Sequence, residues 1–217
     1  MEPEQLTAGT STEDNEDLTT FGLLRHGQTE WNKLKKIQGS CDSPLTAEGK
    51  KKIREWSSFL KKYKWDRILA SDLGRVRETV SILNRELNLP AEYTPQLREQ
   101  AWGDWEGMTI PYVKKTFPED LNRRVQLGWS FSAPNGETRH DVRERTLSAL
   151  SEAGEKWIGE NILIVCHQGV IKSVLYSIAG RDFLPGDDEM LDPNSFHRIA
   201  YGHKHFSNLE LNISRTK

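Results

Sequence analysis

Residues 162–166 constrain the fold of this 217-residue chain more than any other segment, because Ile-Leu-Ile-Val-Cys contains no charged or strongly polar side chain. A run of that kind predicts a strand with both faces buried, as in the middle of a parallel sheet. The strand ends at His167, and a helical pattern follows over 169–179. The shorter apolar run at 21–25 also ends in a histidine, His26, and predicts a second buried strand.

Strands and helices alternate along most of the chain. The hydrophobic spacing further predicts strands at 65–70 and 92–97, a late hairpin at 196–201 and 209–213, and helices at 46–60, 71–87 and 137–158. Thr46 is expected to cap the first of these helices, and Ser71-Asp72 the second. This order predicts an α/β fold, a three-layer sandwich in which helices cover both faces of a mostly parallel central sheet.

Residues 1–19 are predicted to form a disordered acidic leader in front of a single domain at 20–217. The first 20 residues hold six acidic side chains and no Lys or Arg, and they lack the basic and apolar regions of a signal peptide. Residues 100–136 are the least periodic part of the domain and are expected to form an irregular lid that sets specificity. Its aromatic side chains are expected either in the core of the lid or in the pocket: Trp102, Trp105, Trp129 and Phe131.

The bulk composition argues against several classes of partner. The net charge is −2, so no bulk attraction to nucleic acid or to a membrane surface is expected. No run approaches the roughly 20 apolar residues of a spanning helix. Cys41 and Cys166 form no paired motif, which favours a reducing compartment without disulfides. We expect a soluble, cytoplasmic protein.

Side chains suited to phosphate chemistry follow the predicted strand ends, where ligands of α/β sheets bind. Arginine binds phosphate oxygens bidentately, and the helix N-terminus after His167 adds N–H donors. A neutral imidazole is a nucleophile toward phosphorus, and nearby arginines would keep His26 neutral. Glu99 would protonate the departing oxygen and then deprotonate water, and no metal is needed if arginines hold the charge. The candidate set is Arg25, His26, Asn32, Arg75, Glu99 and His167.

The same residues lie in segments that resemble the histidine phosphatase superfamily, in its phosphoglycerate-mutase-like branch. Residues 24–29, Leu-Arg-His-Gly-Gln-Thr, resemble the Arg-His-Gly motif of that family. Further segments resemble family segments in the same order, at 38–49, 71–79, 97–107, 135–138 and 165–171. One triplet alone would be weak evidence, whereas the ordered set predicts a phosphoglycerate-mutase-like fold and a histidine-phosphatase-like catalytic domain.

The resemblance implies a role for each candidate. His26 is the phosphorylated nucleophile and Glu99 the proton donor. The family commonly has His-Gly-Gly at the second histidine, but Gln168 replaces the first Gly here and is expected to restrict the loop or to touch the substrate. The resemblance implies no cofactor and no metal. The implied phosphate and substrate ligands are Arg25, Asn32, Gln38, Gly39, Arg75, Glu99, His167 and Gln168.

The favoured function is a metal-independent phosphomonoesterase acting on a small phosphorylated metabolite, similar to the broad-specificity or α-ribazole phosphate branches. Mutases of this family usually carry a longer insertion after the acid-bearing segment, but only about 30 residues separate Gly107 from Gly136. The alternatives are phosphoglycerate-mutase-type transfer and a non-catalytic phosphate-binding protein, and the complete set of candidate residues argues against the latter. The sequence indicates neither the physiological substrate nor an oligomeric state.

Other residues receive simpler interpretations. His203 and His205 have no third metal ligand nearby and are expected to be loop histidines. The lysines at 50–52 and 61–62 are expected to be solvated helix faces, with attraction of an anionic substrate as the alternative. Cys41 lies in the predicted substrate loop and is expected to be inert, with a reactive thiol as the alternative. Trp31 is the aromatic residue expected to border the pocket.

Overall fold

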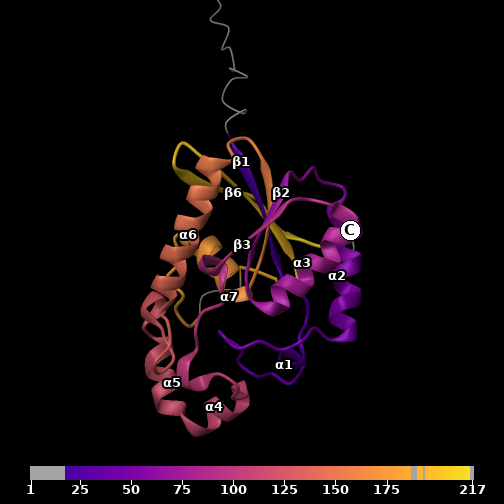
Figure 1. The fold of residues 1–217 in the computed structure, drawn as a ribbon. Coiled ribbons are helices and arrows are strands. Elements are labelled where there is room, and N and C mark those ends of the chain that lie inside the picture. Colours follow the sequence, from indigo (N-terminus) through magenta and orange to yellow (C-terminus); the bar gives the residue numbers. More distant parts are fainter. Residues whose placement is uncertain (1–17, 187–189, 193, 216–217) are drawn as a thin grey trace, which may run out of the picture.

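The computed structural model describes residues 18–186, 190–192 and 194–215, and a six-stranded sheet lies at the centre of this part of the chain. The strand order is β3-β2-β4-β1-β5-β6 (Figure 1). The first four of these strands are parallel, whereas β5 and β6 are antiparallel and close one edge, which confirms the predicted hairpin. The strands are β1 (Thr19–Arg25), β2 (Arg67–Ser71), β3 (Ala91–Thr94), β4 (Asn161–Cys166), β5 (Phe196–Gly202) and β6 (His205–Ile213).

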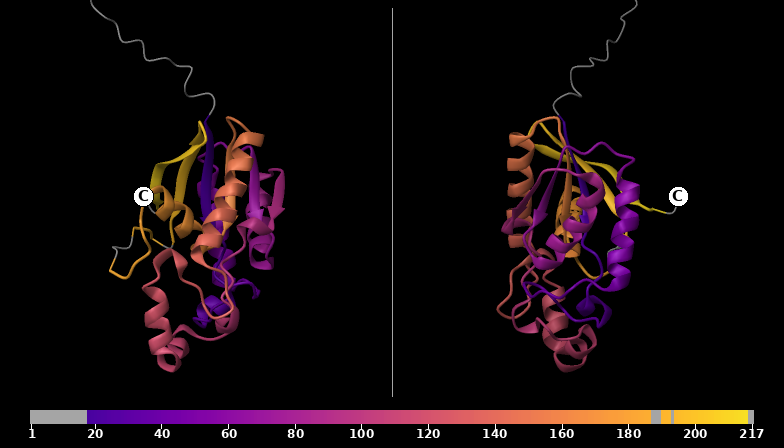
Figure 2. Two further views of the ribbon diagram at one scale, coloured as in Figure 1. Left: turned by 90° about the vertical axis from the view of Figure 1, so that its left-hand side faces the viewer. Right: turned by 45° about the vertical axis from the view of Figure 1, so that its right-hand side comes forward.

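Helices cover both faces of the sheet, which confirms the three-layer sandwich (Figure 2). Leu163 and Val165 of β4 pack in the hydrophobic cluster that includes α2 (Ala47–Leu60) and α3 (Gly74–Leu87). Ile162 and Ile164 pack in the opposite cluster, which includes α6 (Arg139–Lys156) and α7 (Gln168–Ile178). Successive side chains of β4 therefore enter two different cores, which explains why its sequence is apolar throughout.

The two helices on the first face begin in different ways. The Thr46 hydroxyl caps α2 as predicted and accepts a hydrogen bond from the Gly49 N–H at 2.8 Å. The predicted cap of α3 by Ser71-Asp72 is wrong, since Leu73 is the N-cap residue and contributes no side-chain hydrogen bond. The Asp42 carboxylate, from a remote loop, accepts from the first N–H groups of α3 instead, including Arg75 N at 3.2 Å. Asp72 pairs with Arg98.

Several element boundaries differ from the prediction. The strand predicted at 65–70 begins at Arg67, because Trp65 turns inward and its Nε1–H donates to the Leu60 carbonyl at 3.0 Å. The strand predicted at 92–97 ends at Thr94 and is followed by a 3₁₀ turn, η2 (Pro95–Leu97), which Pro95 begins. Helix α6 begins after the capping residue Thr138, and β6 is longer than predicted. Most of the predicted acidic leader, residues 1–17, lies outside the described residues, and β1 already includes Thr19.

Residues 100–136 form a small helical lobe beyond the carboxyl ends of the parallel strands (Figure 1). Trp105 and Phe131 are each 2% exposed and form a separate core with Ile37 and Val113, so these two aromatic residues belong to the core of the lobe. Trp102 packs against that cluster, whereas Trp129 packs against the cluster of α6 and α7. The elements of the lobe are η3 (Gly103–Trp105), α4 (Ile110–Thr116), α5 (Pro118–Val125) and η4 (Gly128–Ser130).

Both cysteines are free thiols, Cys41 exposed and Cys166 buried. Within the described ranges, no helix combines the length and the apolar character that a membrane crossing requires.

Candidate active site

Two histidines meet at the carboxyl ends of adjacent parallel strands. β1 and β4 pair in a register that places Arg25 beside Cys166, so the next residues, His26 and His167, emerge side by side. Their ring centroids lie 5.1 Å apart. The backbone N–H of His26 donates to the backbone carbonyl of Cys166 at 3.0 Å. The prediction that these two strand ends bring the histidines together is confirmed.

The His26 imidazole is buried and oriented by its own loop. Its Nδ1 lies 2.8 Å from the Gly27 carbonyl, and because a carbonyl can only accept, Nδ1 carries the proton and Nε2 keeps a free lone pair. Burial holds the pKa of His26 well below its ordinary value, and the charges of Arg25 and Arg75 lower it further. The ring is therefore neutral near pH 7, with Nε2 as the available nucleophilic atom.

His167 lies deeper than His26 and is fully buried. Its Nε2 pairs with the Ser71 hydroxyl at 3.0 Å, and its Nδ1 is a buried polar atom with no hydrogen-bond partner among the described residues. Burial lowers the pKa of His167 well below the ordinary value, with further contributions from His26, Arg75 and Arg25. His167 is thus a neutral polar group held against the side of the His26 ring.

Arg75 is only 2% exposed and joins the site to the loop at 39–42. Its Nη1 donates to the Asp42 carboxylate at 2.9 Å, and its Nη2 donates to the Gly39 carbonyl at 2.9 Å. Its Nε has no partner among the described residues. We expected the guanidinium of Arg75 to bind phosphate, but its Nη1 and Nη2 already donate to the loop at 39–42. Nε is therefore the nitrogen that remains free to donate to a phosphate.

Arg25 is half-buried and lines the pocket beside His26, and no carboxylate of the described residues forms an ion pair with it. Burial lowers the pKa of Arg25. The negative charge of Glu99 raises this pKa, and the positive charge of Arg75 lowers it. Arg25 is thus coupled electrostatically to Glu99 and to Arg75, and both arginines also lower the pKa of His26.

The Glu99 side chain lies against the N-terminus of α7, the helix that begins directly after His167. Its carboxylate accepts from the Gly169 N–H at 3.2 Å and from the Gln100 N–H at 2.9 Å. A Cβ at position 169 would lie 2.3 Å from Glu99 Oε1, so only glycine at 169 allows this approach. Gln168, the residue that replaces the usual glycine of the family, is half-buried in the first turn of the same helix.

A clamp of two charged residues, which the sequence did not reveal, holds the loop that carries Glu99. Arg145 of α6 forms an ion pair with Glu137 at 2.6 Å. The same guanidinium donates to the Gln96 carbonyl at 2.6 Å and to the Glu99 carbonyl at 3.3 Å. Glu137 lies in the segment that resembles a family motif, but the spacing of eight residues between the partners, across a helix start, is no recognisable pattern.

Of the remaining predicted ligands, Asn32 lines the pocket beside His26, whereas Gln38 and Gly39 are buried and do not line it. Asn32 Oδ1 accepts from the Thr29 N–H at 3.1 Å in the capping box of α1 (Glu30–Lys33), so its amide NH₂ remains as a donor. Gln38 is 7% exposed, and its Oε1 has no partner among the described residues. Gly39 has a φ of +51°, and a Cβ there would lie 2.0 Å from Glu106 Oε1.

Glu106 is a second residue that the sequence analysis assigned to no role. Its carboxylate accepts from the Ser40 N–H at 2.8 Å and from the Trp102 N–H at 3.0 Å, and it therefore ties the loop at 38–42 to the helical lobe. The Cys41 thiol donates to the same carboxylate, and this bond raises the pKa of Cys41, followed by burial. The interpretation of Cys41 as an unreactive thiol agrees with that shift.

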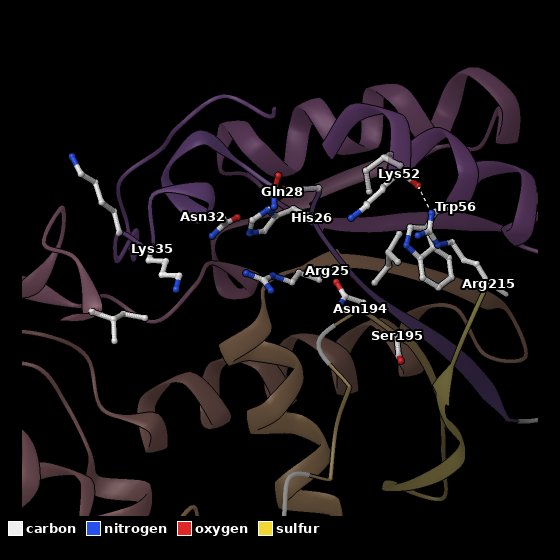
Figure 3. Close-up of a pocket in the computed structure, with 15 residues that line it drawn as sticks. Arg25, His26, Gln28, Asn32, Lys35, Lys52, Trp56, Asn194, Ser195 and Arg215 are labelled. Atoms are coloured by element: carbon white, nitrogen blue, oxygen red, sulfur yellow. Dashed lines mark hydrogen bonds between the residues drawn. The ribbon is translucent and has the colours of Figure 1, made fainter. Parts of the chain in front are cut away.

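A pocket of about 500 Å³ opens beside His26, and Figure 3 shows its lining residues. Of the predicted site residues, Arg25, His26 and Asn32 line it, whereas Arg75, Glu99 and His167 are not among its lining residues. Trp56 is the aromatic residue on its wall, so the expectation that Trp31 would border it is wrong. The sequence analysis also missed Lys35, Lys36 and Arg215, which belong to segments without a recognisable motif.

No group of three or more potential metal ligands lies within the described ranges. His203 lies in the turn between β5 and β6, as expected for a loop histidine, whereas His205 is the first residue of β6, so that expectation is wrong for His205. His197 is 2% exposed, and its Nδ1 accepts from the Asn212 N–H at 3.1 Å, which is a structural contact.

The fold and the site define a class: an α/β protein with two buried neutral histidines and two arginines at the carboxyl ends of its central parallel strands. Residues 21–214 match the family model of the histidine phosphatase superfamily, branch 1. The chain belongs to this superfamily.

Relatives with two kinds of name match most of the chain. It is 33% identical over 165 residues to the uncharacterized phosphatase PhoE of Bacillus subtilis, covering 76% of this chain and 80% of PhoE. It is 33% identical over 159 residues to the probable phosphoglycerate mutase GpmB of Escherichia fergusonii, covering 73% of this chain and 74% of GpmB. The crystal structure of the α-ribazole phosphatase from Shigella flexneri superposes with a TM-score of 0.76 at 26% identity, covering 90% of this chain and 96% of that one. The family therefore supports a phosphatase or mutase activity for this chain.

Proposed function

We propose that the protein is a phosphomonoesterase that hydrolyses a small phosphorylated metabolite through a phosphohistidine on His26, without a metal ion. The observation that carries the proposal is the state of the His26 ring. Its Nδ1–H is fixed on the Gly27 carbonyl at 2.8 Å, its pKa is well below the ordinary value, and Nε2 is left unprotonated beside Arg25.

In the first half-reaction, His26 Nε2 attacks the phosphorus atom and the bond from phosphorus to the ester oxygen breaks. Glu99, in its acid form, gives its proton to the departing oxygen. Arg25, Arg75 Nε and the N-terminus of α7 are the donors that would stabilise the charge on the equatorial oxygens. The buried polar atoms without partners, Arg75 Nε and His167 Nδ1, would gain hydrogen bonds from a bound phosphoryl group.

In the second half-reaction, Glu99 accepts a proton from a water molecule as that water attacks phosphorus, and the bond from phosphorus to Nε2 breaks. This step returns His26 to its neutral form and releases inorganic phosphate. Fixed cations and helix N–H groups supply the charge stabilisation that a metal would otherwise provide. Activity should accordingly survive EDTA treatment, and a loss that added metal restores would contradict this part of the proposal.

Mutase activity is the second candidate, because GpmB matches the chain as well as PhoE does by identity. A mutase excludes water and returns the phosphoryl group to another hydroxyl of the substrate. The segment between Gly107 and Gly136 is short and folds into its own lobe, which favours hydrolysis. The comparison of phosphate release from 3-phosphoglycerate with formation of 2-phosphoglycerate separates the two, since a mutase would isomerise faster than it hydrolyses.

The substitution His26→Ala tests the nucleophile. We expect it to lower phosphate release from p-nitrophenyl phosphate by about 1,000-fold or more, as for loss of a covalent nucleophile. His140→Ala is the matched control, because His140 is an exposed histidine on α6. Turnover by His26→Ala at a level near that of the control would contradict the nucleophile assignment.

A further inference from the structure

Cationic side chains dominate the wall of the pocket beside His26. Of the 15 lining residues, five are cationic and none is Asp or Glu. A volume of about 500 Å³ is several times larger than one phosphate group needs, so the outer part of the pocket must accommodate the rest of the substrate. The cationic residues are Arg25, Lys35, Lys36, Lys52 and Arg215.

The two ends of the pocket differ in how their charges are balanced. In Figure 3, Lys35 lies on one side of His26, with Asn32 between them, and Lys52, Trp56 and Arg215 lie on the other side. At that second end, Arg215 pairs with Glu55 at 2.5 Å and Lys52 lies 3.7 Å from Glu48. The charge there is partly neutralised by the protein itself.

The first end has no such neutralisation. Within the described ranges, neither Lys35 nor Lys36 has a carboxylate within 4.0 Å, and the Lys36 ammonium lies 5.4 Å from the Trp31 ring centroid. The backbone fixes both residues, because Lys36 N donates to the Trp31 carbonyl at 2.9 Å and Ile110 N donates to the Lys35 carbonyl at 3.1 Å. Two adjacent like charges at the edge of a concave pocket attract an anion strongly.

We propose that the substrate carries a second anionic group, a phosphate or a carboxylate, which binds Lys35 and Lys36 while the reacting phosphate lies at His26. The inference builds on the proposed hydrolysis at His26 and adds the chemical class of the leaving group. Asn32 lies between the two anion sites, so its free amide NH₂ faces the span that a short linker would cross. Lysine suits such a site because its ammonium binds either anion as a point charge.

Three phosphate esters with a common three-carbon leaving group test the proposal. Propane-1,3-diol monophosphate leaves a neutral alcohol, 3-(phosphonooxy)propanoate leaves a carboxylate, and propane-1,3-diol bisphosphate leaves a phosphate ester. The kcat/KM of the wild-type protein should be about 10-fold or more higher for at least one anionic ester than for the neutral one. The preferred ester identifies which anion the lysines bind.

The double variant Lys35→Gln/Lys36→Gln removes both charges and keeps the main-chain hydrogen bonds of the loop. We expect it to lose the preference for the anionic ester, so that its kcat/KM values for the three esters lie within about 3-fold of one another. Lys114→Gln/Lys115→Gln is the matched control, since these adjacent lysines are exposed on α4 and do not line the pocket. The control should retain the wild-type preference.

The outcomes separate this inference from the proposed function. Equal rates on all three esters, or an equal loss of preference in the control, would overturn the second anion site and leave hydrolysis at His26 intact. A wild-type protein that hydrolyses none of the three esters, nor p-nitrophenyl phosphate, would overturn the proposed function itself. A preference that disappears only in the Lys35 and Lys36 variant supports both.

Discussion

The inner and outer halves of the pocket are built differently. The inner half consists of side chains that strand ends and a helix N-terminus fix in place, and His26, Arg75 and His167 are 6%, 2% and 0% exposed. The outer half consists of long cationic side chains such as the exposed Lys35 and Lys52. Charges interact strongly in the buried half and are screened by solvent and salt in the exposed half. The difference suggests that the inner half sets the chemistry and the outer half selects the molecule.

After the loss of the His26 nucleophile itself, the largest effect within the inner half should follow from Glu99→Gln. The amide keeps the shape of the side chain but cannot supply the proton. We expect turnover of alkyl phosphates to fall about 100-fold or more, because an alkoxide is a poor leaving group that needs protonation. Turnover of p-nitrophenyl phosphate should fall much less, since a nitrophenolate leaves readily.

Glu106→Gln is the control for Glu99→Gln, because Glu106 is a nearby carboxylate that ties two loops together without reaching Glu99. It should slow all leaving groups to the same extent. A uniform loss for Glu99→Gln, with no dependence on the leaving group, would contradict the role of Glu99 as the acid.

A smaller effect should follow from Arg145→Lys, which tests whether the clamp positions Glu99. One ammonium cannot replace a guanidinium that binds Glu137 and two carbonyls of the Glu99 loop. We expect kcat for an alkyl phosphate to fall about 10-fold, with KM and p-nitrophenyl phosphate turnover nearly unchanged. Arg143→Lys serves as the control, since Arg143 pairs only with the neighbouring Glu144 among carboxylates of the described residues. Equal losses on both substrates would indicate a structural role alone.

The buried histidines should also make stability depend on pH. The pKa values of His26 and His167 lie well below the ordinary value, and burial lowers the pKa of His197 to about 4. In the unfolded chain these histidines titrate near pH 6.5, so below that pH the unfolded state binds more protons and the free energy of unfolding falls. Each such group contributes a slope of up to about 1.4 kcal/mol per pH unit.

Urea unfolding at several pH values between about 7 and 5 measures this slope. His197→Gln, which removes one of the buried imidazoles outside the pocket, should reduce it, and His140→Gln should leave it unchanged, because His140 is exposed. A free energy of unfolding that stays constant over this range would contradict the neutral, buried state of these histidines.

The same division explains what the sequence could reveal. The inner half was predictable because apolar runs mark buried strands, and the carboxyl ends of parallel strands lie at one edge of a sheet. The residues that follow β1 and β4, His26 and His167, could therefore be predicted to lie close together. The contacts that hold the inner half together were not predictable, because each joins segments that are remote in the sequence. They are the bonds of Asp42 at the start of α3, of Arg145 to the Glu99 loop and of Glu106 to Ser40. Apart from Lys52, for which attraction of an anionic substrate was an alternative, the cationic residues of the outer half escaped prediction. Surface lysines carry no periodicity, and only the fold gathers Lys35 and Arg215 around one pocket.

A rapid-quench experiment with a ³²P-labelled phosphate ester tests the central claim most directly. The label should appear on the protein within the first turnover, be stable in base and labile in acid, and map to the peptide that contains His26. His140→Ala should label normally and His26→Ala should not. Wild-type turnover without any protein-bound phosphate, or label on a residue other than His26, would contradict the account.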